Sequence, residues 1–136
     1  MTFTITEILV LIISHWIADF LTQTRWQADN KSSNNLALAS HVGTYTVTLF
    51  IIFSLSCIVL WHSVATNQIE DLGFDSNILW FFPITFVLHF ITDYITSRVT
   101  SYFYRTKQIK NFFSVIGFDQ ILHYVQLFLT YHFLTY

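Results

Sequence analysis

Charged residues are scarce in this sequence. Asp, Glu, Lys and Arg together make up 10% of the 136 residues, whereas soluble domains carry about 25%. Hydrophobic residues account for 54%, aromatic residues for 19%, and the mean hydropathy is +0.53. A chain this short cannot hide so much apolar surface in one core, because small domains bury a limited fraction of their area. The composition therefore predicts a membrane protein that forms one domain over residues 1–136.

Several features that would indicate other functions are also missing. The one cysteine, Cys57, excludes an intrachain disulfide framework and a cysteine-rich zinc site. Six Lys and Arg residues against eight Asp and Glu residues give a net charge of −2, so no basic field indicates a nucleic-acid partner. The sequence has no glycine-rich phosphate loop, no dinucleotide-binding fingerprint and no HExxH motif. The lipid bilayer is the partner that the composition favours.

Polar clusters divide the chain into four apolar runs, each long enough for the roughly 20 residues that a membrane helix needs. The four runs are residues 5–24, 36–61, 78–98 and 112–136. The first run follows no basic segment and carries His15 and Asp19, which argues against a cleaved signal peptide. We therefore expect an all-α, polytopic membrane protein with four transmembrane helices; a soluble helical bundle with polar loops is the alternative. Because four short spans enclose little volume, a homodimer is also expected.

The basic residues predict the orientation of these helices. All six follow the first or the third run, and the segment after the second run carries three acids with no Lys or Arg. The positive-inside rule then places loops 25–35 and 99–111 in the cytoplasm and both termini outside, in a bacterial-type inner membrane. The six residues are Arg25, Lys31, Arg98, Arg105, Lys107 and Lys110.

One pattern occurs twice. The sequence HWIADFLTQ at His15–Gln23 reappears as HFITDYITS at His89–Ser97, with His, Ile, Asp and Thr at identical spacing. Both copies lie on runs that would cross the membrane in the same direction. The repeat predicts two helical hairpins related by an axis along the membrane normal, as in transporters with parallel repeats.

Each copy places its His and Asp on one helix face, since residues four apart share a side. The fourth run carries the pair in reverse order, Asp119 and His123, which restores the same depth in a helix that runs the other way. At 1.5 Å per residue, the three aspartates lie ~7–8 Å and their histidines ~13–14 Å from the cytoplasmic ends, and His41 lies near the aspartates. The predicted cluster in the cytoplasmic half of the bundle is His15, Asp19, His41, His89, Asp93, Asp119 and His123, with Gln23 and Gln120 beside it.

Carboxylates this close together inside a membrane cannot all stay ionised without protons or a metal ion. Imidazole together with carboxylate suits zinc, manganese or iron. We therefore expect one or two divalent metal ions, and an open coordination position would support hydrolysis of a lipid-linked or phosphoryl substrate. Two alternatives use the same residues: a structural protein in which the cluster only fixes helix packing, and a proton- or ion-coupled element. The mostly apolar outer halves of the runs argue against an ion pathway.

The order of these motifs resembles a known family. HWIADFLTQ in the first run, His41 early in the second, HFITDY in the third and FDQILH in the fourth are similar to small bacterial and phage membrane proteins grouped as domain of unknown function 3307. The resemblance covers nearly the whole chain and implies a helical membrane protein with no established activity. A looser similarity links the chain to small membrane-bound proteins regarded as metal-dependent hydrolases, which also carry His and Asp on short helices.

Overall fold

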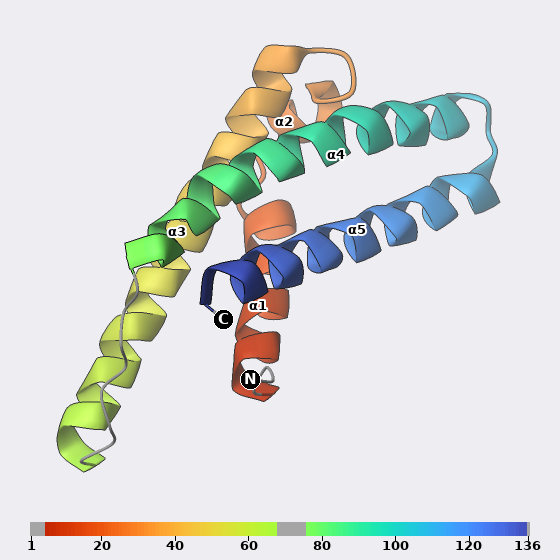
Figure 1. Ribbon diagram of the computed structural model, residues 1–136. Coiled ribbons are helices and arrows are strands. Elements are labelled where there is room, and N and C mark those ends of the chain that lie inside the picture. Colours follow the sequence, from red (N-terminus) through yellow and green to blue (C-terminus); the bar gives the residue numbers. More distant parts are fainter. Residues whose placement is uncertain (1–4, 68–75, 136) are drawn as a thin grey trace.

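The computed structural model describes residues 5–67 and 76–135, and every regular element in these ranges is helical (Figure 1). The described residues contain no strand, which confirms the all-α class. In chain order the elements are α1 (Ile5–Trp16), the π-helical turn η1 (Ile17–Leu21), α2 (Arg25–Asn30), α3 (Asn35–Asn67), the 3-10 turn η2 (Ser76–Trp80), α4 (Phe81–Arg105) and α5 (Ile109–Thr135).

Three of the described helical segments are long and apolar enough to cross a membrane. They are Asn35–Ser56, Asn77–Arg105 and Ile109–Thr135. These segments indicate membrane association, while the expected fourth span and the pseudo-repeat stay predictions. The first copy of the repeat passes through the π-helical turn, whereas the second lies in the regular helix α4.

The first apolar run, expected to span residues 5–24, ends its helical path at Leu21. The amide of Thr22 donates to the carbonyl of Ile17 at 3.2 Å, which closes the wide turn. Thr24 then begins α2 with a capping box: its hydroxyl accepts from the amide of Gln27, and its own amide donates to the Gln27 side chain. The expected loop 25–35 therefore contains a short helix.

The other polar segments are shorter than predicted. The expected cytoplasmic loop 99–111 is reduced to residues 106–108, because residues 99–105 contain no glycine or proline and α4 continues to Arg105. Lys107, with a φ of 58°, makes the reversal into α5. The second helix, expected to end at residue 61, is helical through Asn67, and the acids of that polar segment, Glu70, Asp71 and Asp75, lie outside the described residues.

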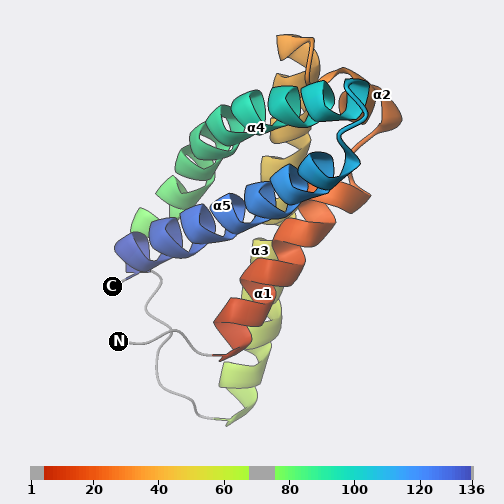
Figure 2. The ribbon, with the colours of Figure 1, turned by 90° about the vertical axis from the view of Figure 1, so that its right-hand side faces the viewer.

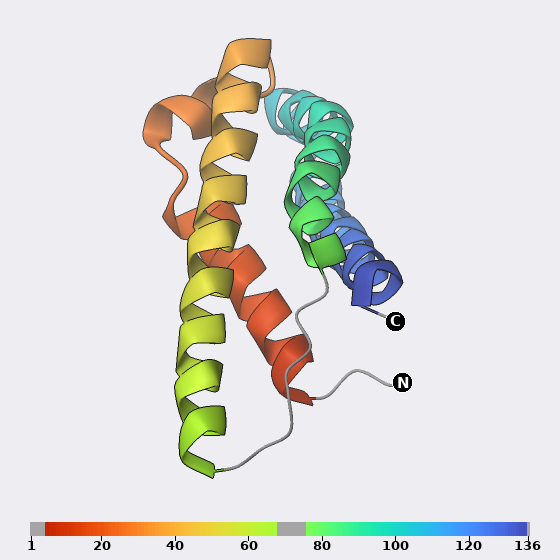
Figure 3. The same ribbon diagram turned by 60° about the vertical axis from the view of Figure 1, so that its left-hand side comes forward.

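The long helices pack in two crossing pairs. Helices α4 and α5 run side by side as an antiparallel hairpin, and the hairpin lies across α1 and α3 (Figures 1 and 2). Helix α3 contacts both α1 and α4 (Figure 3). The four helices therefore meet near the middle of the molecule, where α1 and η1 approach α3, α4 and α5.

The burial pattern is inverted relative to a soluble protein. Among the described residues, buried polar side chains are at least as numerous as buried apolar ones, and they include four histidines and two aspartates. Large apolar side chains such as Val47, Ile91 and Ile121 are more than half exposed. Exposed apolar area this extensive marks a surface that another apolar medium covers, which agrees with helices suited to a bilayer.

Candidate metal centre

The polar cluster is assembled from all four long helical segments. Segment α1–η1 contributes His15 and Asp19, α3 contributes His41, α4 contributes His89 and Asp93, and α5 contributes Asp119 and His123. The four histidines and Asp93 are at most 2% exposed, Asp19 is 4% exposed, and Asp119 lies at the edge of the cluster. The structure thus brings together all seven residues that the sequence singled out.

Asp19 lies in the π-helical turn. Such turns are rare, and they are found frequently at functional sites. The extra residue in the turn changes which way the following side chains point, and the Asp19 carboxylate faces the nitrogens of His41 and His89. Its distance from His15, one turn earlier, is 3.8 Å. The local backbone therefore directs Asp19 toward α3 and α4.

The first candidate ligand group contains Asp19, His41, His89 and Asp93, all buried. Nε2 of His41 lies 3.1 Å from Asp19 Oδ1 and 3.3 Å from Asp93 Oδ2, and Nε2 of His89 lies 3.6 and 3.7 Å from the same two oxygens. Four ligand atoms about 2.0–2.2 Å from one ion at the corners of a tetrahedron are roughly 3.3–3.6 Å apart. The spacing of these four atoms therefore suits a metal ion between them.

The second candidate group contains Asp93, Asp119 and His123. Nδ1 of His123 donates to the carbonyl oxygen of Asp119 at 2.9 Å, so its Nε2 presents a lone pair, and this Nε2 lies 3.6 Å from Asp93 Oδ1. Asp93 therefore turns Oδ2 toward the first group and Oδ1 toward the second. A carboxylate that offers one oxygen to each of two groups is suited to bridge two metal ions.

Several buried nitrogens in the cluster have no hydrogen-bond partner among the described residues. They are both ring nitrogens of His89, Nε2 of His123 and Nδ1 of His41. Buried polar atoms are nearly always hydrogen-bonded, and each exception needs a reason such as an ion. A metal ion in the first group would engage Nε2 of His89, and one in the second group would engage Nε2 of His123, so the residues present fit a metal.

His15 lies outside both ligand groups. Its Nδ1 is 2.9 Å from the hydroxyl of Tyr45 and its Nε2 is 3.2 Å from Oε1 of Gln120. Because an amide oxygen can only accept, Nε2 donates and Nδ1 accepts from Tyr45. The amide nitrogen of Gln120 in turn donates to Asp19 at 3.3 Å and to Asp119 at 3.2 Å. His15 and Gln120 therefore orient two carboxylates, as the residues around metal ligands do.

Three further residues join the cluster without having been singled out in the sequence. Tyr45 is fully buried with its ring 4.0 Å from that of His89, Thr96 donates to Asp119 at 2.6 Å, and Lys31 reaches Asp93. Helical spacing could have signalled the first two, because Tyr45 lies one turn after His41 and Thr96 three residues after Asp93. Lys31 lies on the turn after α2, where no periodicity predicts the direction of its side chain, and its charge in the sequence indicates only the orientation of the helices.

Lys31 is the cation of this cluster. Its Nζ lies 2.8 Å from Asp93 Oδ2 and 3.3 Å from Nε2 of His41. Burial by itself would lower the pKa of Lys31, but the nearby charges of Asp93 and Asp19 outweigh that effect and raise its pKa above the ordinary value. The Lys31 side chain therefore keeps its positive charge beside the carboxylates.

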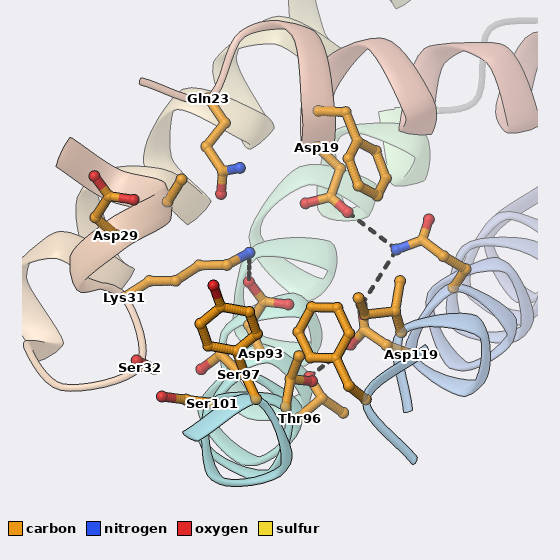
Figure 4. Close-up of a pocket in the computed structure, with 17 residues that line it drawn as sticks. Asp19, Gln23, Asp29, Lys31, Ser32, Asp93, Thr96, Ser97, Ser101 and Asp119 are labelled. Carbon is orange, nitrogen blue, oxygen red and sulfur yellow. Dashed lines mark hydrogen bonds and ion pairs between the residues drawn. The ribbon is translucent and has the colours of Figure 1, made fainter. Parts of the chain in front are cut away.

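A cavity of about 590 Å³ adjoins the cluster on the side of the carboxylates (Figure 4). Asp19, Asp93 and Asp119 line it, whereas the four histidines of the cluster do not. Gln23 also faces it, and its buried Oε1 has no hydrogen-bond partner within residues 5–67 and 76–135. Asp29 and Lys31 add charged groups to the lining. Much of the remaining wall combines hydroxyl and apolar side chains, among them Thr96, Ser97, Thr100 and Ser101 with Phe20, Tyr104, Phe112 and Ile116. A molecule in this cavity would meet the carboxylates directly.

The fold and the site together define a helical protein with a buried His/Asp centre that could hold a metal, and with helices able to cross a membrane. Residues 8–136 match the family described as protein of unknown function (DUF3307), and the chain belongs to this family. The resemblance seen in the order of the four motifs is thereby confirmed. No curated protein and no solved structure matches the chain. The looser similarity to membrane-bound hydrolases stays a prediction.

Proposed function

We propose that the protein is an integral membrane, metal-dependent hydrolase that acts on a lipid-linked or phosphoryl substrate. One observation carries the proposal: the Asp93 carboxylate belongs to both candidate ligand groups and lines a cavity. Interhelical packing alone would need only one or two polar contacts, whereas several buried nitrogens of this cluster find no hydrogen-bond partner in the described part of the chain.

The donor set favours a divalent transition metal, namely zinc, manganese or iron. Imidazole nitrogens and carboxylate oxygens suit these ions, and they are the ligand atoms that both groups of described residues offer. When bound, such an ion polarises a phosphoryl or carbonyl oxygen and lowers the pKa of a water molecule. We assign Asp19, His41, His89 and Asp93 to the first metal, and Asp93, Asp119 and His123 to a second. His15, Gln120 and Gln23 would then orient ligands or substrate.

The charge of the cluster favours an anionic substrate. Three aspartates and one lysine leave two negative charges, and two divalent cations would convert these to two positive charges. A phosphoryl group would balance that charge. In the hydrolysis, the oxygen of a water molecule bonds to phosphorus, the bond from phosphorus to the lipid oxygen breaks, and the water proton goes to that oxygen. The cavity volume lies within the range of small-molecule sites, roughly 300–1,000 Å³, and its hydroxyl and apolar walls suit a head group with a lipid portion.

We also propose four membrane spans within a single domain, arranged as two hairpins in a parallel pseudo-repeat. The segment Ile5–Leu21 would extend about 25 Å at 1.5 Å per residue, close to the ~30 Å of a bilayer core. The grouping of the basic residues supports a cytoplasmic side at loops 25–35 and 99–111, with both termini outside an inner membrane. The partners are then the bilayer and a second copy of the chain in a homodimer, with no nucleic acid.

Metal analysis of the purified protein, combined with an assay on lipid phosphates and lipid diphosphates in detergent, tests the proposed function. We expect one or two metal ions per chain, phosphate release that a chelator abolishes, and loss of both in His89→Ala and Asp93→Ala. His132→Ala, a histidine outside both ligand groups, is the matched control.

Two outcomes would contradict the proposal. Metal-free wild-type protein whose cluster variants simply unfold would indicate a structural role for the cluster. Wild-type protein that stays folded without metal and carries protons across liposome membranes would indicate an ion-coupled element.

A further inference from the structure

Lys31 lines the cavity, and the short helix α2, which is attached to α3, holds it there. Its amide donates to the carbonyl of Gln27 at 2.9 Å. The buried side chain of Gln27 donates to the hydroxyls of Ser40 and Thr44, at 3.0 Å each, and so fastens α2 to α3. From this turn the Lys31 side chain crosses toward Asp93 (Figure 4). The position of its ammonium group is therefore set by the fold.

The contacts of that ammonium group conflict with those of His41. An ammonium group has only protons to donate, so Nε2 of His41, 3.3 Å away, would have to present a lone pair to it. The same Nε2 lies 3.1 Å from Asp19 Oδ1 and 3.3 Å from Asp93 Oδ2, and its hydrogen bond with the Asp19 oxygen, which can only accept, requires a proton on Nε2. One ring nitrogen cannot meet both demands. A metal ion among these atoms, in contrast, would bind the lone pair of His41 Nε2 and both carboxylate oxygens at the same time.

Lys31 is also the basic residue that counters the charge of the three aspartates. Among the described residues, no other Lys or Arg forms an ion pair with Asp19, Asp93 or Asp119. Arg98, the nearest basic residue along α4, instead bonds Asn35 and the carbonyl of Tyr94. Lys31 Nζ thus occupies the region that a divalent metal in the first ligand group would need.

We propose that Lys31 is a tethered internal cation that competes with a divalent metal ion for Asp93 and His41. The inference rests on the proposed metal centre and adds a determinant of its affinity. Metal binding releases the ammonium group from Asp93 into the cavity that Lys31 lines. The site binds metal only in the fraction of molecules in which Lys31 has left Asp93. If Lys31 occupies the site about nine-tenths of the time, the apparent metal affinity is about tenfold weaker than that of the free site.

Amine labelling of the wild-type protein tests the release of Lys31. The detergent-solubilised protein is treated with an acetylating reagent, with and without Zn²⁺ or Mn²⁺, and acetylation of each lysine is followed by mass spectrometry. Lys107 and Lys110, which are exposed near the α4–α5 turn, serve as internal references. We expect metal to accelerate acetylation of Lys31 several-fold relative to both references. Equal or slower acetylation of Lys31 with bound metal would overturn the proposal.

Metal titration of Lys31→Met tests the competition itself, with Lys110→Met as the control. We expect Lys31→Met to bind Zn²⁺ or Mn²⁺ about tenfold more tightly than wild type, and to unfold at a lower temperature when metal is removed. If Lys31→Met does not fold under any condition, the labelling result decides.

The outcomes separate this inference from the proposed function. Metal bound with the same affinity by wild type and Lys31→Met would overturn the competition alone. Metal bound by neither protein would overturn both the competition and the proposed centre. Tighter binding to Lys31→Met without any hydrolytic activity would support the competition and contradict the hydrolase.

Discussion

The carboxylate of Asp93 turns Oδ2 toward His41 and His89 and Oδ1 toward His123. Both candidate ligand groups therefore depend on this one side chain. Asp93→Asn keeps the shape of the side chain but removes its charge, so we expect it to lose metal from both groups. Residues that only support metal ligands change metal affinity by roughly 10–100-fold, and the loss in Asp93→Asn should be larger than that. Metal content after equilibrium dialysis, measured by mass spectrometry, checks this.

Asp29→Asn is the control for that change, because Asp29 lines the same cavity but belongs to neither ligand group. It should retain the wild-type metal content. If Asp93→Asn kept half of the wild-type metal, Asp93 would serve one group only and would not bridge two ions.

Tyr45 contacts the cluster through His15. Its hydroxyl lies 2.9 Å from Nδ1 of His15, and both residues are fully buried. Tyr45→Phe leaves that nitrogen without its donor, and we expect a loss of about 1 kcal/mol in the free energy of unfolding. Since His15 acts on Asp19 through Gln120, metal affinity should also fall, by roughly tenfold. Denaturant unfolding and metal titration in detergent measure the two effects.

Tyr102→Phe provides the comparison, because Tyr102 is 58% exposed. A Tyr45→Phe protein as stable as Tyr102→Phe would show that the hydroxyl contributes nothing to the cluster.

At the residue scale, sequence spacing predicted the cluster well where regular helices carry it. The pairs His89–Asp93 and Asp119–His123 lie one turn apart, and helix geometry alone makes each pair share a face. Spacing could not show that His15 contacts Tyr45 and Gln120 while His41 and His89 face the same two oxygens. That distinction depends on how the helices cross and on the π-helical turn at Asp19.

At the scale of elements, α2 shows that a polar segment between two apolar runs can form a helix. The segment was expected to be a loop, yet Thr24 and Gln27 have the spacing of a capping box, a signal that the sequence does contain. The length of α4 was underestimated for a different reason: polar residues at 99–105 marked a membrane boundary, and a membrane boundary need not end a helix. Only the reversal at Lys107 ends it.

Gln27 connects this element to the site. Its side chain accepts from the Thr24 amide and donates to Ser40 and Thr44. We expect Gln27→Ala to accelerate hydrogen exchange of the α2 amides and of the turn that carries Lys31, and to leave α4 and α5 unchanged. The loss of a cap and of two side-chain bonds should cost about 1–3 kcal/mol. Hydrogen exchange read out by mass spectrometry, segment by segment, checks this.

Gln108→Ala is a suitable control, because Gln108 also bonds through its side chain but lies on the exposed α4–α5 turn. Unaltered exchange in α2 after Gln27→Ala would mean that other contacts hold this helix against α3.

At the scale of the whole molecule, composition predicted the medium better than the number of spans. The low charge and high hydropathy predict helices suited to a bilayer. In agreement with this, the described helices bury histidine and aspartate side chains and expose valine, isoleucine and phenylalanine side chains. Hydropathy could not show that the helical path from Ile5 ends at Leu21, because that ending depends on the wide turn and on the cap of the next helix rather than on polarity.

The direction in which the protein crosses the membrane is the remaining prediction at this scale. The α4–α5 turn carries Lys107, with Lys110 one turn into α5. If loop 99–111 is cytoplasmic, a membrane-impermeant amine reagent should modify both lysines in inside-out vesicles and neither in sealed right-side-out vesicles. Modification in detergent defines complete reaction, and mass spectrometry of the peptides gives the extent. The reverse pattern would invert the topology. Lys31 precedes the start of α3, and Lys107 follows the end of α4. If both helices cross the membrane, in opposite directions, Lys31 and Lys107 lie on the same side, and the inverted topology would place Lys31, with the part of the cavity that it lines, on the outer side.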